Sequence, residues 1–101
     1  MKDLYVSALL DVYGEFLSEK QKTLTEYYYN DDLSLSEIAE NEGITRQGVN
    51  DLIKRAVGQL KGWEEKCGLC EKILKLKDLS QKVREGETVL SGDILDIIDE
   101  L

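Results

Sequence analysis

The chain has 101 residues and a mass of 11.5 kDa, with 42% hydrophobic and 34% charged residues. This length and balance indicate an ordinary soluble protein of one domain, or one domain with a tail, and exclude a disordered chain. Pro is absent, which favours helix; His is also absent, which removes histidine-based catalysis and imidazole metal ligands.

The net charge is −8, the wrong sign for attracting nucleic acid through overall charge. No apolar stretch approaches the ~18 residues that a membrane helix needs, and the N-terminus lacks a signal-peptide pattern. With only two Cys, the sequence predicts a cytoplasmic protein that has no membrane partner.

Two helices are predicted in the N-terminal third. Leu4, Ala8 and Val12 recur every four residues, with Leu9 and Tyr13 beside them, and predict the apolar face of a helix over 3–13 that ends at Gly14. Further along, Ser18-Glu19-Lys20-Gln21 has the form of a capping box, and the helix it opens is expected to run to about Tyr29. Its consecutive tyrosines, 27–29, are expected to pack on the core; base stacking is the alternative.

A helix-turn-helix is the best-defined pattern in the chain. Ser34 and Glu37 form a second capping box, so a short helix is expected at about 35–42. Gly43 permits the left-handed turn, and Thr45 caps a longer helix that follows. Six positions carry the small, turn-forming or inward apolar residues that this packing needs: Ile38, Ala39, Gly43, Ile44, Val49 and Leu52.

The start of the longer helix presents polar residues that suit base edges and phosphates. The predicted DNA-binding residues are Thr45, Arg46, Gln47, Asn50, Asp51, Lys54 and Arg55. From residue 44 to 61 four basic residues and one acid give a local charge of +3, whereas residues 31–42 hold five acids and no base. The alternative interpretation is a solvated helix face beside a good cap.

The C-terminal part is expected to be a helical extension. An amphipathic stretch follows Gly68, and a turn marked by Gly86 and Gly92 precedes a last helix that Ser91 caps. The apolar content of that helix is Ile94, Leu95, Ile97, Ile98 and Leu101. Residues 66–84 carry a local charge of +4 and residues 85–101 one of −6, so these segments are expected to pair within one chain or between two. A homodimer through the C-terminal helices is one hypothesis; an acidic tail that covers the basic face is the other.

Cys67 and Cys70 have C-x-x-C spacing, but two Cys without His fall short of the four ligands of a structural zinc site. They are expected to be incidental thiols rather than a redox pair or half of a metal site in a dimer, and no cofactor is predicted.

The run DLSLSEIAENEGITRQGVNDLIKRA, residues 32–56, resembles region four of bacterial sigma factors. The segment 10–69 resembles the YlxM-like family of small bacterial helix-turn-helix proteins. That resemblance implies a regulatory role in the signal recognition particle pathway, because the genes of the family tend to lie beside those for the particle's GTPase and its receptor.

The sequence thus predicts an all-α protein, with a helix-turn-helix domain without a wing at 1–65 and a helical extension at 66–101. The expected function is DNA-binding regulation rather than catalysis, because no nucleophile–base pair, phosphate loop or metal cluster is present. The alternative function is an adaptor that binds protein or RNA of the same pathway. Two features favour the adaptor: the negative net charge, and Gly48 at a position where relatives tend to have Ala.

Overall fold

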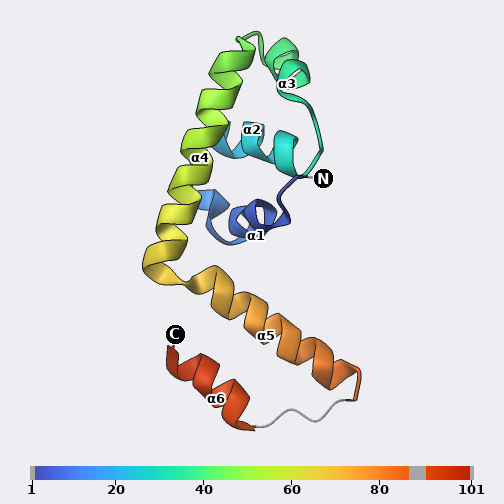
Figure 1. Cartoon of the computed structure of the whole chain (residues 1–101), viewed down its shortest axis with the longest axis vertical. Helices are drawn as coiled ribbons and strands as arrows, with labels where there is room; N and C mark the ends of the chain where they lie inside the picture. The colour runs from blue at the N-terminus through green and yellow to red at the C-terminus, as the bar shows by residue number, and fades with distance from the viewer. Residues whose placement is uncertain (1, 87–90, 101) are drawn as a thin grey trace. The chain divides into compact units, whose positions relative to one another are not determined.

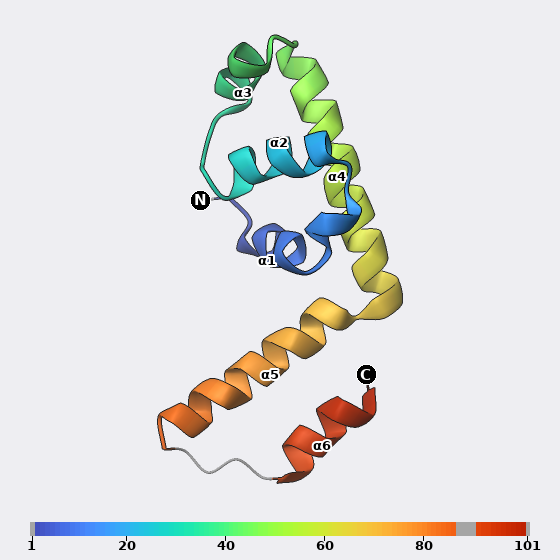
Figure 2. The same cartoon turned by 180° about the vertical axis from the view of Figure 1, so that it is seen from behind.

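Every regular element in the described part of the chain is helical. The structure is a computed structural model that describes residues 2–86 and 91–100 (Figures 1 and 2). The elements are α1 (Leu4–Tyr13), the 3-10 turn η1 (Gly14–Phe16), α2 (Glu19–Tyr29), α3 (Leu35–Glu42), α4 (Arg46–Cys67), α5 (Leu69–Arg84) and α6 (Ser91–Glu100). The predicted all-α class is confirmed. Within the described ranges no helix combines the length and apolarity needed to cross a membrane.

The chain divides into two compact units, Met1–Lys66 and Cys67–Leu101. The first unit contains α1, α2, α3 and nearly all of α4. Within it, α1, α2 and α3 lie along one side of the long α4 in both ribbon views (Figures 1 and 2). The second unit contains α5 and α6.

The helix starts in the first unit follow the predicted capping signals. Ser18 Oγ accepts a hydrogen bond from the Gln21 amide at 3.2 Å, and Gln21 Oε1 accepts one from the Ser18 amide at the same distance. Ser34 and Glu37 repeat this reciprocal pair at the start of α3, at 3.0 and 3.1 Å. Both predicted capping boxes are confirmed, and each provides partners for amide groups that the first turn leaves unbonded.

The predicted apolar face of α1 is confirmed for Leu9 and Tyr13, which are buried, but it is wrong for Leu4, Ala8 and Val12. The buried residues of this helix are Val6, Leu9, Leu10 and Tyr13. Leu4 is 68% exposed, and Ala8 and Val12 are only half-buried. The buried set also has helical spacing, and it carries larger side chains, so turning this face inward buries more apolar area against the rest of the unit.

One core cluster joins α2, α3 and α4. It consists of the buried side chains of Leu24, Ile38, Ala39, Val49 and Ile53. Residues 27–29 pack against it as half-buried tyrosines, with the Tyr28 and Tyr29 rings edge-to-face at 5.0 Å. The predicted core role of the tyrosines is therefore confirmed.

A second set of contacts fixes α1 and η1 to the C-terminal half of α4. Tyr13 and Phe16 place their rings 6.4 and 5.9 Å from that of Trp63. The Tyr13 hydroxyl donates a 2.6 Å hydrogen bond to Glu64 Oε1. The N-terminal helix and the 3-10 turn are therefore packed against α4 through both aromatic and polar contacts.

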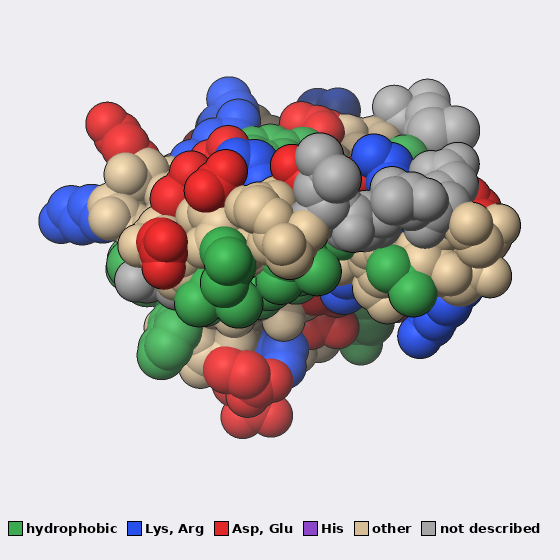
Figure 3. All heavy atoms as spheres, turned by 90° about the horizontal axis from the view of Figure 1, so that it is seen from below, with side chains coloured by type: hydrophobic (Ala, Val, Ile, Leu, Met, Phe, Trp, Pro, Cys, Tyr) green, Lys and Arg blue, Asp and Glu red, His purple; other side chains and the backbone are tan. Residues whose placement is uncertain are grey.

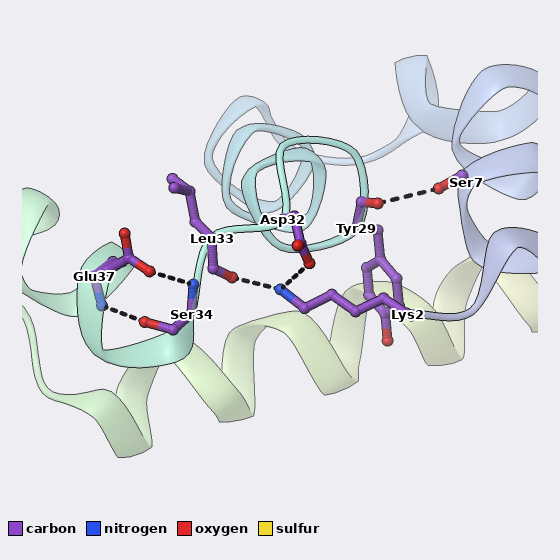
Figure 4. Close-up of polar contacts among 7 residues, drawn as sticks. All are labelled: Lys2, Ser7, Tyr29, Asp32, Leu33, Ser34 and Glu37. Atoms are coloured by element: carbon purple, nitrogen blue, oxygen red, sulfur yellow. Dashed lines mark hydrogen bonds and ion pairs between the residues drawn. The ribbon is translucent and has the colours of Figure 1, made fainter.

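The N-terminus is attached to the connection between α2 and α3 (Figure 4). Lys2 Nζ donates a 2.6 Å hydrogen bond to the Leu33 carbonyl, lies 3.5 Å from Asp32 Oδ1 and stands 3.7 Å from the centroid of the Tyr28 ring. We call Lys2, Tyr28, Asp32 and Leu33 the Lys2 cluster. Asp32, a member of this cluster, has a φ of 57°, which is uncommon for a residue other than Gly.

In the second unit, α5 and α6 pack against each other, with Cys70 and Ile97 buried. Glu100 pairs with Lys72 at 3.2 Å and Lys75 at 3.9 Å, so basic and acidic segments of one chain do pair.

Two details at the end of the chain differ from expectation. The predicted cap at Ser91 and turn residue at Gly92 are wrong, because α6 begins at Ser91 and both residues lie in its first turn. Gly86, by contrast, has the φ of +79° that suits a turn. Leu101, predicted to belong to the apolar content of this helix, lies outside the described residues.

Candidate nucleic-acid interface

The turn between α3 and α4 sets the position of the candidate interface. Gly43 ends α3 with φ +68°, in the left-handed region, and its amide donates to the Ala39 carbonyl. The Ile44 amide also donates to the Ala39 carbonyl, at 3.2 Å. The chain is thereby redirected into α4 within three residues.

The six predicted motif residues come together around this turn. Ile38, Ala39 and Val49 are buried in the core cluster, and Ile44 and Leu52 are half-buried against it. Gly43 is exposed at the turn itself. Ala39 of α3 shares this cluster with Val49 of α4, and its small side chain suits the close crossing that a helix-turn-helix requires.

Thr45 caps the leading end of α4. Its Oγ1 accepts a 2.9 Å hydrogen bond from the Gly48 amide. A Thr cap stabilises a helix by about 1 kcal/mol, which is similar to the cost of placing Gly rather than Ala in its first turn. The first turn is therefore held in place although Gly48 weakens it, and the Thr45 hydroxyl can still donate a hydrogen bond outward.

Most of the predicted DNA-binding side chains are open to solvent. Those classed as exposed are Thr45, Arg46, Gln47, Asp51, Lys54 and Arg55. Asn50 is half-buried and lines a hollow of about 290 Å³ together with Tyr28, Tyr29 and Lys54. Burial raises the pKa of the Tyr29 hydroxyl above its ordinary value, and the neighbouring Tyr28 and Asp3 act in the same direction.

A second hollow, of about 540 Å³, lies between α4 and the start of α2. Its lining residues are Ser18, Gln21, Gly48, Asp51, Leu52 and Arg55. Gln21 Nε2 donates a 2.8 Å hydrogen bond to Gln59 Oε1 and so fixes the start of α2 beside α4. The sequence does not predict this link, because the capping box accounts for Gln21 only within its own helix.

The local charge of the candidate interface is positive. From Arg46 to Lys61 all four basic side chains and the single acid are exposed. Two of the five acids in residues 31–42 already have partners: Asp32 lies beside Lys2, and Glu37 accepts from the Ser34 amide. The ion pair of Asp32 with Lys2 offsets part of the repulsion that the acidic segment would exert on a phosphate backbone, whereas Glu37 keeps its charge.

The two thiols differ in their exposure to solvent. Cys67 is exposed at the end of α4, whereas Cys70 is buried in α5, and neither forms a disulfide. Over residues 2–86 and 91–100 no group of three or more Cys, Asp or Glu side chains is arranged to hold a metal ion.

Comparison with known proteins identifies the family. The UPF0122 family model, described as "Putative helix-turn-helix protein, YlxM / p13 like", matches residues 1–98. The chain belongs to this family. A UPF0122 protein of Clostridium acetobutylicum is 40% identical over 103 residues, which cover 97% of this chain and 89% of the relative.

Other UPF0122 relatives agree. A UPF0122 protein of Clostridium kluyveri is 43% identical over 96 residues, which cover 95% of this chain and 77% of the relative. A UPF0122 protein of Desulforamulus reducens is 48% identical over 93 residues, which cover 91% of this chain and 77% of the relative. The resemblance to YlxM-like proteins is confirmed, and UPF0122 is a helix-turn-helix family rather than a known enzyme family.

Proposed function

We propose that this UPF0122 protein is a regulator that binds double-stranded DNA by inserting the leading half of α4 into the major groove. The observation that carries the proposal is the exposure of Arg46, Gln47, Lys54 and Arg55 on a helix that a helix-turn-helix holds at its start. Arg and Gln side chains can read guanine and adenine, and Lys and Arg can neutralise phosphates.

A gel-shift titration against genomic fragments at several salt concentrations tests the proposal. A retarded species that weakens steeply as salt rises is expected, because phosphate contacts release counterions. The absence of any retarded species at low salt would contradict DNA binding. A structured RNA in the same titration separates the alternatives, since preferential binding of RNA would favour an RNA-associated factor.

The pathway is a further part of the proposal. The gene neighbourhood of YlxM-like proteins supports a role in the signal recognition particle pathway. A second candidate function, an adaptor that binds protein or RNA of that particle, is supported by the net charge of −8. Pull-down from a lysate with and without nuclease distinguishes the two, because only a direct protein partner is retained after nuclease treatment.

We also propose that the second unit forms a homodimer. Leu74 on α5 and Leu95 and Ile98 on α6 are about half exposed, and hydrophobic side chains reach the surface among charged ones (Figure 3). The basic α5 and acidic α6 of one chain are complementary to α6 and α5 of a second copy, as a two-fold interface requires.

Sedimentation at micromolar concentration checks the dimer. The wild type is expected to sediment as a dimer and the Ile98→Glu variant as a monomer. A wild type that stays monomeric at all concentrations would contradict the proposal. A dimer would allow two copies of α4 to read two half-sites.

A further inference from the structure

From Arg46 to Lys61 the exposed surface of α4 carries one acid, Asp51, among four bases. Asp51 is exposed, one turn after Gln47 and one turn before Lys54 and Arg55. The Gln47 amide Nε2 donates a 2.9 Å hydrogen bond to Asp51 Oδ1. Among the described residues no basic side chain lies within 4 Å of the Asp51 carboxylate, so its charge is not neutralised within the protein.

Because the proposed function places this surface in the major groove, the carboxylate must meet either phosphates or base edges. Phosphates repel it, and a carboxylate accepts hydrogen bonds but donates none. Only the amino groups of cytosine and adenine offer donors in the major groove. Adenine places its N7 acceptor beside that amino group, so it repels a carboxylate, whereas cytosine places only a C–H there.

We propose that Asp51 makes this protein select cytosine at one position of its DNA site, by accepting a hydrogen bond from the cytosine N4 amino group. The inference rests on the proposed function and adds a base preference to it. Gln47 acts as a positioning residue, because its hydrogen bond to Oδ1 orients the carboxylate and leaves Oδ2 open to the base. Lys54 and Arg55, exposed one turn further along α4, can neutralise phosphates of the same site.

Selection from a random duplex pool tests the inference, using the full-length wild type, Asp51→Asn and Asp51→Ala. The wild type is expected to enrich a motif with one invariant cytosine. Asp51→Asn is expected to replace that cytosine with adenine, because an amide pairs with the N6 and N7 atoms of adenine. Asp51→Ala is expected to lose the preference at that position alone. Exchanging the cytosine is expected to weaken the wild type by about 10-fold, within the range for one base contact.

Glu65→Gln is the matched control, since it removes one exposed acid from the far end of α4 and is expected to leave the motif unchanged. If Asp51→Ala selects the wild-type motif, or tightens binding to all duplexes equally, the carboxylate merely repels DNA and the inference is overturned while the proposed function stands. If the wild type enriches no duplex, both the inference and the proposed function fail.

Discussion

Lys2 lies over the ring of Tyr28, with its Nζ atom 3.7 Å from the ring centroid. The same ammonium donates to the Leu33 carbonyl at 2.6 Å, so one side chain joins the N-terminus to the segment that leads into α3 (Figure 4). Since α3 supports the start of α4, the Lys2 cluster helps to fix the candidate interface in place.

Replacing Lys2 by Ala is expected to lower the free energy of unfolding by about 1–2 kcal/mol, because a charge-assisted hydrogen bond and a cation–π contact are lost. Urea denaturation followed by circular dichroism measures this change. Lys20→Ala is the control, because Lys20 is exposed on α2 and is expected to matter little. Equal stabilities of the two variants would show that the cluster does not stabilise the fold.

Two glycines of the helix-turn-helix region are expected to respond to Ala in opposite directions. Gly58 lies in α4 with no atom within 4 Å of an added Cβ, so Gly58→Ala is expected to raise the free energy of unfolding by about 0.5–1 kcal/mol. Gly43 also has open space around an added Cβ, but its φ of +68° strains any L residue. Gly43→Ala is therefore expected to lower the free energy of unfolding by about 1 kcal/mol. Thermal unfolding of both variants provides the comparison. A stabilising Gly43→Ala would show that the left-handed turn is not required.

Thr25 is fully buried in α2, and its Oγ1 has no hydrogen-bond partner among the described residues. Thr25→Val keeps the shape of the side chain and removes the unsatisfied hydroxyl, so it is expected to stabilise the protein by about 1 kcal/mol. Thr23→Val, on the half-buried side of the same helix, controls for the change in helix propensity. A destabilised Thr25→Val variant would indicate that the hydroxyl has a partner in solution.

Local signals in the sequence predicted the helix starts well. Ser18, Ser34 and Thr45 act through hydrogen bonds to amides three residues away, so the partners are visible in the sequence. The buried face of α1 was not predictable in this way, because two overlapping sets of apolar residues both have helical spacing. Only packing against the rest of the unit selects the set that contains Val6 and Leu10.

Contacts between distant residues could not be predicted at all. Lys2 and Leu33 are 31 positions apart, and Tyr13 and Glu64 are 51 apart. No periodicity or motif marks such pairs, since they arise only when separate helices are brought together. The hydrogen bond between Gln47 and Asp51 is of the other kind, because residues four apart on a helix are neighbours on its surface.

The salt dependence of DNA binding shows whether the leading half of α4 contacts the phosphate backbone. Fluorescence anisotropy with a selected duplex should give a linear fall of log affinity with log salt, and Lys54→Ala with Arg55→Ala should reduce the slope by about 2, one unit for each phosphate contact removed. Lys77→Ala, which removes an exposed base from α5, should leave the slope unchanged. An unchanged slope in the α4 double variant would contradict the claim that this surface of α4 binds DNA.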